Sequence, residues 1–352
     1  MLQALLVTIL TLALLVAFLV LSAVIGRRLF GTEAPVDHAR RITTKDHVGL
    51  RLVRIDPRTS PRKHPVLLVH GIAANSANLN LDPDDSLAFS LADAGFETWL
   101  IDLRTTRYTT AEGRPQADLE TLTRQDLEAA ISEVLRASGA PALHLLGFSM
   151  GGLITTLRVA LGPRTGLRTV TLIGAPMILR SMIWFGVGRT AGRALLAGTL
   201  PTRWLAQPFW WLAGVIHFWP MTLVANSRDL PRTVMRRAVF RLLENIPNTL
   251  LADFEKLVGQ RHAAMAEDSC LAEAPCPLLC IAGTADGLAP PESASLAYDH
   301  WGHSDKTMVV LGPDTAGRPF GHADLVLGPH ARKHVDHRVT EWITARDQPG
   351  ES

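Results

Sequence analysis

The sequence predicts an α/β fold with a doubly wound, mostly parallel sheet. Short runs of strand-forming residues alternate along the chain with segments of helical periodicity. The runs are apolar throughout, which is typical of strands that helices cover on both faces. A chain of 352 residues is long enough for one large domain of this class with an inserted subdomain.

Six strands and three helices follow from this pattern. The predicted strands are Val66–Val69, Thr98–Ile101, Leu143–Phe148, Val170–Ile173, Leu278–Ile281 and Met308–Leu311, and the predicted helices are Ser86–Ala94, Leu127–Arg136 and Leu153–Leu161. Ligand sites in such sheets lie beyond the carboxyl ends of the strands, so the residues after each strand are the first place to look for chemistry.

The chain begins with an uncharged apolar segment, Leu2 to Ile25, which is 24 residues long. At 1.5 Å per residue this length crosses about 30 Å of hydrocarbon. A cleaved signal peptide is the alternative, with Ser22-Ala23 in a small-residue cleavage site. No Lys or Arg precedes the run and the run exceeds a signal core, so we predict an uncleaved single-pass anchor over residues 1–26, followed by a linker over 27–41.

Four arginines after the apolar run predict the orientation of the anchor: Arg27, Arg28, Arg40 and Arg41. The positive-inside bias then places the catalytic domain in the cytoplasm. The three cysteines, Cys270, Cys276 and Cys280, agree with a reducing compartment, and their spacing does not fit paired zinc knuckles. We interpret them as packing residues.

The segment Met177 to His262 departs from the strand–helix alternation. It is helical in pattern, rich in tryptophan (Trp184, Trp204, Trp210, Trp211 and Trp219), and holds eleven basic against four acidic residues. We predict that residues 177–262 form a helical cap inserted into a core of residues 42–176 and 263–346. The apolar face of this cap either packs on the core or lines a substrate channel, and its basic excess either contacts anionic lipid or is simply solvated.

A G-x-S-x-G sequence, Gly147 to Gly151, joins a predicted strand to a predicted helix. This context makes it a nucleophile elbow, in which Ser149 adopts a strained positive φ and projects its hydroxyl above the sheet. Gly147 and Gly151 avoid collisions between strand and helix. The N-terminus of the following helix offers backbone N–H groups to an oxyanion, and the N–H of Met150 is the first of them.

A serine nucleophile needs a base and a group that orients the base, here expected in the order Ser, Asp or Glu, His. Asp286 follows the strand Leu278–Ile281, and His322 lies in the loop after Met308–Leu311. We therefore predict a Ser149–His322–Asp286 triad, with Asp102 as the second choice for the acid. The other competitors are Asp314, Asp324, His300 and His303, of which the two histidines precede the last strand at the wrong end of the sheet.

His70-Gly71 follows the strand Val66–Val69 directly, where a second oxyanion donor is expected. We predict that His70 shapes this loop by hydrogen bonding and does not titrate during catalysis.

These motifs together resemble the α/β-hydrolase superfamily, and within it the acid lipases and the polyhydroxyalkanoate synthase-like proteins. The resemblance is carried by VHGIAANSANLNL, DSLAFSLADAGFETWLIDLR, GFSMGG, AGTADGLAPP and FGHADLVLG, between Val69 and Gly328. It implies an α/β-hydrolase fold, assigns the triad to Ser149, Asp286 and His322, and assigns the second oxyanion donor to Ile72. The segment between Ala175 and Ala274 matches no family that we can name.

The chain also departs from these families. Ile101 to Thr105 stands where the lipases carry Gly-Asn-x-Arg-Gly, and Phe148 and Met150 replace the His and Gln that flank their serine. The polyester synthases use cysteine where this chain has Ser149. Together with the apolar anchor and cap, these motifs predict a membrane-anchored serine hydrolase acting on carboxylic esters, lipid-like or of medium to long acyl chain. An acyltransferase using the same triad and a catalytically silent interaction module are the alternatives.

Other kinds of site find little support in the sequence. His330, His334 and His337 have a spacing that suits a metal, but we interpret them as a polar helix face and expect no metal site. The chain has neither a Walker P-loop nor a GxGxxG string at a strand–helix junction, so we expect no cofactor. A net charge of +2 gives no case for nucleic acid. The oligomeric state does not follow from the sequence.

Overall fold

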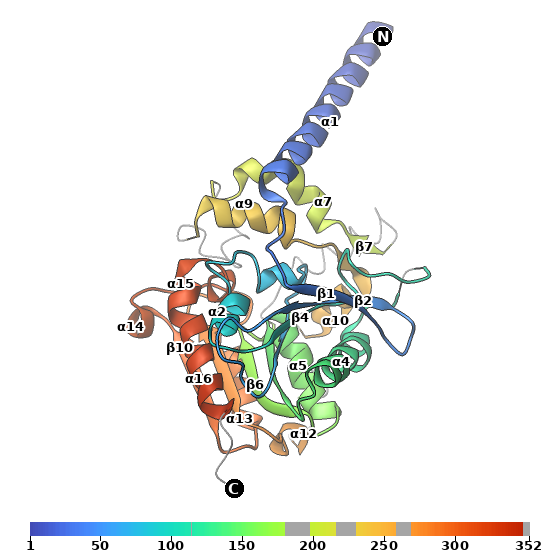
Figure 1. The fold of residues 1–352 in the computed structure, drawn as a ribbon. Coiled ribbons are helices and arrows are strands. Elements are labelled where there is room, and N and C mark those ends of the chain that lie inside the picture. The colour runs from blue at the N-terminus through green and yellow to red at the C-terminus, as the bar shows by residue number, and fades with distance from the viewer. Residues whose placement is uncertain (114, 180–197, 216–229, 258–268, 348–352) are drawn as a thin grey trace.

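The computed structural model describes residues 1–113, 115–179, 198–215, 230–257 and 269–347. An eight-stranded sheet runs through the body of the molecule in the order β1-β2-β4-β3-β5-β6-β9-β10 (Figure 1). Its strands are β1 (His38–Thr43), β2 (Gly49–Ile55), β3 (Val66–Val69), β4 (Thr98–Asp102), β5 (Leu143–Phe148), β6 (Leu167–Ile173), β9 (Leu278–Gly283) and β10 (Lys306–Leu311). The predicted α/β class and all six predicted strands are confirmed.

The six strands from β4 to β10 pair in parallel, whereas β1 pairs antiparallel with β2 and β2 pairs antiparallel with β4. The hairpin β1–β2 was not among the predicted strands. It begins at His38, inside the segment 27–41 that we predicted as a linker. β1 is an edge strand whose arginines, Arg40 and Arg41, are not buried, so its sequence lacks the apolar run by which the central strands are recognised.

Helices cover both faces of the sheet and produce two hydrophobic clusters. The described helices, including 3-10 and π segments, are α1 (Leu2–Phe30), η1 (Ser76–Asn78), α2 (Leu87–Asp93), α3 (Leu119–Thr121), η2 (Leu122–Leu127), α4 (Glu128–Ser138), α5 (Met150–Leu161), α7 (Thr202–Ala206), η3 (Gln207–Leu212), α9 (Arg232–Arg241), α10 (Asn248–Lys256), α12 (Ser269–Ala272), α13 (Pro291–His300), α14 (Pro313–Ala316), η4 (Ala323–Leu325), α15 (Pro329–Ala331), η5 (Arg332–Asp336) and α16 (His337–Asp347).

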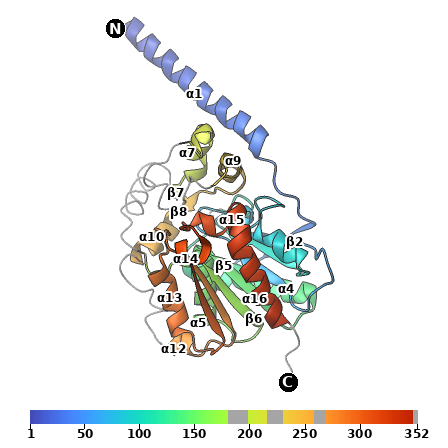
Figure 2. The same cartoon turned by 90° about the vertical axis from the view of Figure 1, so that its left-hand side faces the viewer.

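The two clusters divide the helices between the faces. One cluster joins buried residues of α4, α5, α10 and α13 to the sheet, and the other joins residues of α2, α9 and α16. Figure 2 shows α16 and α5 with the strands between them. This double cover explains why the central strands are apolar at every position.

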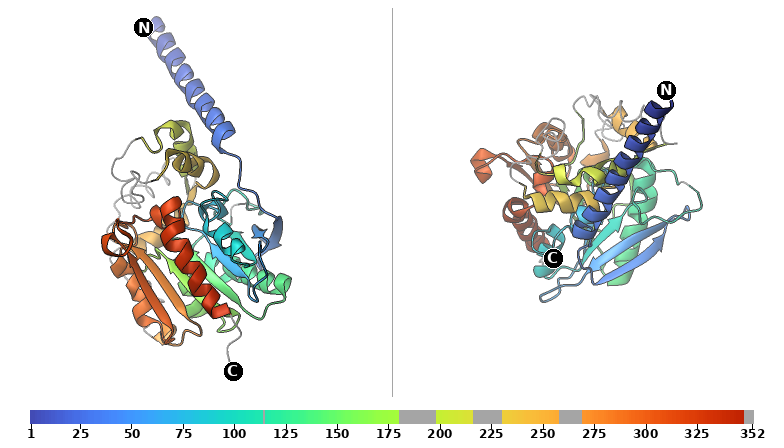
Figure 3. Two further views of the ribbon diagram at one scale, coloured as in Figure 1. Left: turned by 60° about the vertical axis from the view of Figure 1, so that its left-hand side comes forward. Right: turned by 90° about the horizontal axis from the view of Figure 1, so that it is seen from above.

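The helix α1 projects from the body, and its lower end lies beside α7 and α9 in all views (Figures 1 and 3). Gln3–Phe30 is long and apolar enough to cross a membrane, with mean hydropathy 3.0 and no part of its most apolar window buried. The helix continues to Phe30, four residues beyond the predicted anchor boundary.

Only part of the predicted cap, 177–262, falls within the described residues. Its described elements are α7, η3, α9 and α10, together with two short antiparallel strands, β7 (Thr199–Leu200) and β8 (Ile246–Pro247). Trp184 and Trp219, and the basic residues Arg180, Arg189, Arg193, Arg228 and Arg261, lie outside the described residues.

Cys270, Cys276 and Cys280 form no disulfide. Cys276 and Cys280 are buried, and burial raises the pKa of the Cys276 thiol to about 12. A thiol in such surroundings is protonated and unreactive at neutral pH, which agrees with a packing role.

A buried carboxyl at the end of η5 predicts a pH effect on stability. Burial raises the pKa of Asp336 to about 7, while the Ser90 hydroxyl donates to its Oδ2 at 3.1 Å. An unfolded aspartate releases its proton near pH 4, so between about pH 4 and 7 the folded state binds more protons and the free energy of unfolding falls as pH rises.

We therefore expect Asp336→Asn to stabilise the protein relative to the parent increasingly across this window, by up to about 1.4 kcal/mol per pH unit. Thermal unfolding of both proteins between pH 4.5 and pH 8 measures this. If the stability of Asp336→Asn differs from that of the parent by the same amount at every pH, the expectation is contradicted.

Candidate functional site

Ser149 occupies the turn between β5 and α5 with φ 54° and ψ −122°. Its neighbours leave no space for side chains: a Cβ atom at Gly147 would lie 2.3 Å from the carbonyl oxygen of Gly151, and one at Gly151 would lie 2.3 Å from that of Val69. The strand and the helix therefore approach each other as closely as glycine permits. The strained turn is the backbone conformation that we predicted for the G-x-S-x-G sequence.

The structure brings Ser149, His322 and Asp286 together. His322 Nε2 lies 2.8 Å from Ser149 Oγ, and His322 Nδ1 lies 2.7 Å from Asp286 Oδ2. All three side chains are buried, with 3–5% of their surface exposed. In this order the imidazole can accept the proton of the serine hydroxyl, and the carboxylate can orient the imidazole and stabilise its positive charge.

The loops after β9 and β10 hold the imidazole and the carboxylate in place. Asp286 Oδ1 accepts hydrogen bonds from the backbone N–H groups of Leu288 and Ala289, at 2.9 and 2.8 Å. The ring of His322 packs at a tilt against the ring of Phe148, with centroids 4.9 Å apart. These backbone bonds fix Oδ1 of the carboxylate, so Oδ2 faces the imidazole of His322 and accepts its hydrogen bond.

The competing residues have other partners. Asp102 accepts from Arg51 Nε at 2.5 Å and from the Ser76 N–H at 2.7 Å, so it connects β2 to the loop after β3. His300 Nδ1 contacts the Leu296 carbonyl, and His303 accepts from the Asp305 N–H. Neither histidine contacts Ser149.

Asp324 and Asp314 also serve elsewhere. Asp324 accepts from the Gly321 N–H at 2.8 Å, so it shapes the turn that carries His322. Asp314 lies in the first turn of α14, where a negative charge stabilises the helix terminus.

One predicted oxyanion donor, Met150, directly follows Ser149, and the other, Ile72, follows a residue that lies near it. Met150 is the first residue of α5, so its N–H has no acceptor within the helix. A Cβ atom at Gly71 would lie 3.1 Å from the Cβ of Ser149, so the residue before Ile72 lies close to the serine. Ala73, which follows Ile72, has a positive φ of 55°, so this loop is strained as well.

His70 holds this loop, as we predicted. Its Nε2 accepts from the Leu103 N–H at 3.2 Å, so its Nδ1 carries the proton and donates to the Gly71 carbonyl at 2.8 Å. Burial lowers the pKa of His70, which keeps the ring neutral in this arrangement. Asn78 adds a further bond, since its Oδ1 accepts from the Gly71 N–H at 3.0 Å.

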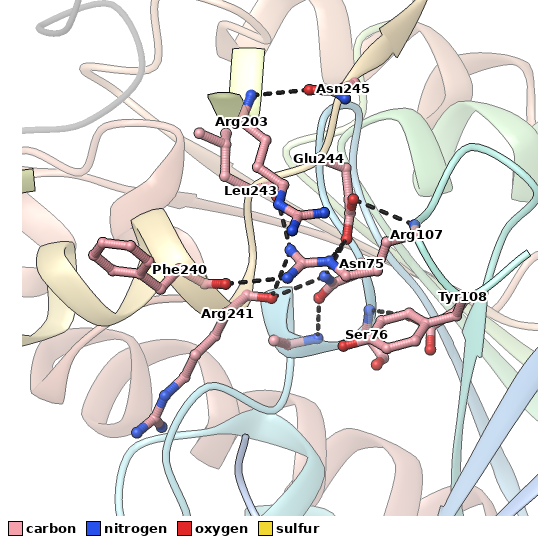
Figure 4. A network of polar contacts seen from close by, with 12 residues as sticks. Asn75, Ser76, Arg107, Tyr108, Arg203, Phe240, Arg241, Leu243, Glu244 and Asn245 are labelled. Carbon is pink, nitrogen blue, oxygen red and sulfur yellow. Dashed lines mark hydrogen bonds and ion pairs between the residues drawn. The ribbon is translucent and has the colours of Figure 1, made fainter. Parts of the chain in front are cut away.

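A network of polar contacts, missed by the sequence analysis, connects the loop after β3 to the predicted cap (Figure 4). The Glu244 N–H donates to the Ala73 carbonyl at 2.8 Å, and Asn75 Nδ2 donates to Glu244 Oε1 at 2.7 Å. Arg107 donates from Nε to the same carboxylate and from its terminal nitrogens to the carbonyls of Phe240 and Leu243. The sequence gives no signal for these contacts because more than 130 residues separate Arg107 from Glu244.

The predicted polar histidine face is not a converging set of ligands. His334 packs edge-on against Phe320, and His337 pairs with Glu341 on the exposed side of α16. Within the described ranges a different trio gathers, in which Asp347 Oδ1 lies 2.8 Å from His64 Nδ1 and 3.3 Å from His144 Nε2. These contacts attach the C-terminal helix to the sheet.

A strained serine turn above a parallel sheet, followed by an acid and a histidine on later loops, defines the class of α/β hydrolases. Residues 64–314 match the model of the alpha/beta hydrolase fold family. The chain belongs to that family.

Among curated relatives, Lipase 1 of Drosophila melanogaster is 34% identical over 131 residues, which are 35% of this chain and 28% of that protein. The poly(3-hydroxyalkanoate) polymerase subunit PhaC of Haloferax mediterranei is 23% identical over 86% of this chain and 63% of its own length. The chain thus spans less than two thirds of either relative. A soluble variant of monoglyceride lipase from Saccharomyces cerevisiae has the same fold, with TM-score 0.64, 15% identity, and coverage of 91% of this chain and 98% of that one.

The contacts of Glu244 lead to a prediction about the loop after β3. Glu244 is buried, and burial raises the pKa of its carboxyl, while the guanidinium of Arg107 stabilises its charge. Glu244→Gln leaves Arg107 without its counter-ion, and breaking a buried ion pair costs about 3–5 kcal/mol. We expect the free energy of unfolding to fall by about that amount, and hydrogen exchange of peptides covering Ile72–Asn78 to accelerate.

Glu120→Gln is the matched control, because Glu120 pairs only at the surface with Arg124. It should change neither measurement. Equal behaviour of the two variants would show that the network does not support the loop.

Proposed function

We propose that this protein is a carboxylic ester hydrolase in which Ser149, His322 and Asp286 form the catalytic triad. The single observation that carries the proposal is the continuous contact from Ser149 Oγ through the imidazole to Asp286, at 2.8 and 2.7 Å. The lipases among its relatives agree with this chemistry.

In the proposed reaction Ser149 Oγ attacks the ester carbonyl while His322 Nε2 accepts its proton. The N–H groups of Ile72 and Met150 receive the oxyanion, a contribution worth about 2.7–4 kcal/mol per donor in comparable enzymes. His322 then protonates the leaving alcohol, and an acyl-enzyme remains on Ser149. Water, activated by the same imidazole, releases the acid and restores the serine.

We further propose that α1 anchors the protein in a membrane as a single-pass helix, with the catalytic domain on the cytoplasmic side. Arg27 and Arg28 in the last turn of the helix support this orientation. Residues 177–262 act as a cap on the core formed by 42–176 and 263–346. An anchor beside the cap favours lipid-like esters with medium or long acyl chains.

Acyl transfer to an alcohol is the second candidate reaction, because the same acyl-enzyme can be attacked by an alcohol in place of water. The likeness to a poly(3-hydroxyalkanoate) polymerase subunit supports it. Added acceptor alcohol yields a transesterified product in this case. A silent interaction module is the third candidate, supported by the burial of Ser149.

A fluorophosphonate probe should label the parent protein at Ser149, because its hydroxyl contacts the imidazole of His322, which Asp286 holds in turn. Ser149→Ala should abolish labelling and lower ester hydrolysis by about 10⁴-fold or more. Ser295→Ala is the control, since Ser295 only donates to the Glu292 carbonyl, and it should behave as the parent does. A folded parent protein that neither labels nor hydrolyses esters would identify the silent module.

Hydrolysis of p-nitrophenyl esters should increase from acetate to longer acyl chains, because each buried CH₂ contributes about 0.8 kcal/mol to binding in an apolar channel. The comparison of kcat/KM from two to sixteen carbons measures this. Preference for acetate would contradict a lipid-like substrate.

A further inference from the structure

Among the described residues of the body, large apolar side chains are exposed mainly in one region. Outside Met1 and α1, the exposed large apolar residues among those described are Leu161 and five residues of α7, η3 and the turn that follows. These five, here called the α7–η3 surface, are Trp204, Leu205, Phe209, Trp211 and Val215, with 43–62% of their surface exposed. A concentrated exposed apolar patch marks a surface that binds something apolar.

The α7–η3 surface adjoins the helix that is proposed to span the membrane. Ser22 Oγ donates to the Pro208 carbonyl at 2.8 Å, and Trp210 Nε1 donates to the Ser22 carbonyl at 2.9 Å. The ring of Trp210 also packs against Phe30, with centroids 5.3 Å apart. η3 is therefore fixed against the part of α1 that runs from Ser22 to Phe30.

The Ser22 end of that part coincides with the expected edge of the bilayer core. A hydrocarbon core of about 30 Å takes about 20 residues of helix at 1.5 Å per residue, and counting from Leu2 it ends near Leu21. Trp211, which belongs to η3, then lies at the depth where tryptophan is enriched in membrane proteins.

Basic and apolar groups are arranged around this level as an interfacial surface requires. Arg236 of α9 lies over the Trp210 ring, 5.4 Å from its centroid, and Arg27 and Arg28 end α1. A groove of about 310 Å³ between α1 and η3 is lined mainly by apolar side chains, among them Val16, Val20 and Pro208. Acyl chains fit such a groove, and arginines at its lower edge can pair with lipid phosphates.

We propose that the α7–η3 surface inserts into the interfacial layer of the same bilayer that α1 spans, so that the protein is held at two points. The occupant of the surface is lipid. The inference rests on the proposed anchoring by α1 and adds a second, monotopic contact, which places the predicted cap directly on the membrane from which a lipid-like ester would enter.

The test uses the full chain in phosphatidylcholine vesicles that contain lipids with a doxyl group at acyl carbon 5. In a Cys270→Ser background, which leaves only two buried thiols, an NBD fluorophore is attached to Leu205→Cys or to Trp211→Cys. Glu120→Cys, on an exposed position of α3, is the matched control. We expect bright NBD emission that doxyl lipid quenches at 205 and 211, and dim, unquenched emission at 120.

NBD emission at 205 and 211 that doxyl lipid does not quench overturns the proposal. Bright emission without lipid quenching, accompanied by dimers in analytical ultracentrifugation, would assign the surface to a second copy of the chain instead. Vesicle flotation of the same samples reports anchoring by α1, and fluorophosphonate labelling reports the hydrolase. A failure of anchoring by α1 or of the hydrolase activity can therefore be told apart from a failure of the contact between the α7–η3 surface and the membrane.

Discussion

The contact between β5 and α5 at Ser149 is the constraint on which the site depends. Gly147 and Gly151 have no side chains, and any Cβ there would overlap backbone atoms that cannot move independently. This close approach forces Ser149 to its positive φ and directs its hydroxyl toward His322. The other parts of the site are arranged around that fixed point, since each follows the carboxyl end of a parallel strand. The loop after β3 lies beside β5, and Asp286 follows β9, which is separated from β5 by β6.

Much of this arrangement could be predicted because it is encoded locally. An apolar strand ending in G-x-S-x-G constrains five consecutive residues, and strand order then limits where an acid and a base can be. Asp286 and His322 lie where this reasoning expected them. The strand β1 escaped prediction because Arg40 and Arg41, neither of them buried, interrupt the apolar pattern of a strand.

The contacts of Glu244 could not be predicted for a different reason. Its partners Asn75 and Arg107 come from loops that are remote in sequence, and none of the three carries a motif. A buried glutamate in a basic segment is visible in a sequence only as one of many charges. Its role follows from tertiary packing, which places it over the strained backbone of Ala73.

Arg241, at the end of α9, contacts two other parts of the molecule at once. Its Nε donates to the carbonyl of Phe30, the last residue of α1, and its Nη1 donates to the carbonyl of Leu81 beyond η1. One guanidinium therefore links α1, the predicted cap and the segment that follows η1. A hinge motion of α9 away from the core would therefore either carry α1 with it or break these bonds first, so under the proposed anchoring a movement of α9 is coupled to a tilt of α1.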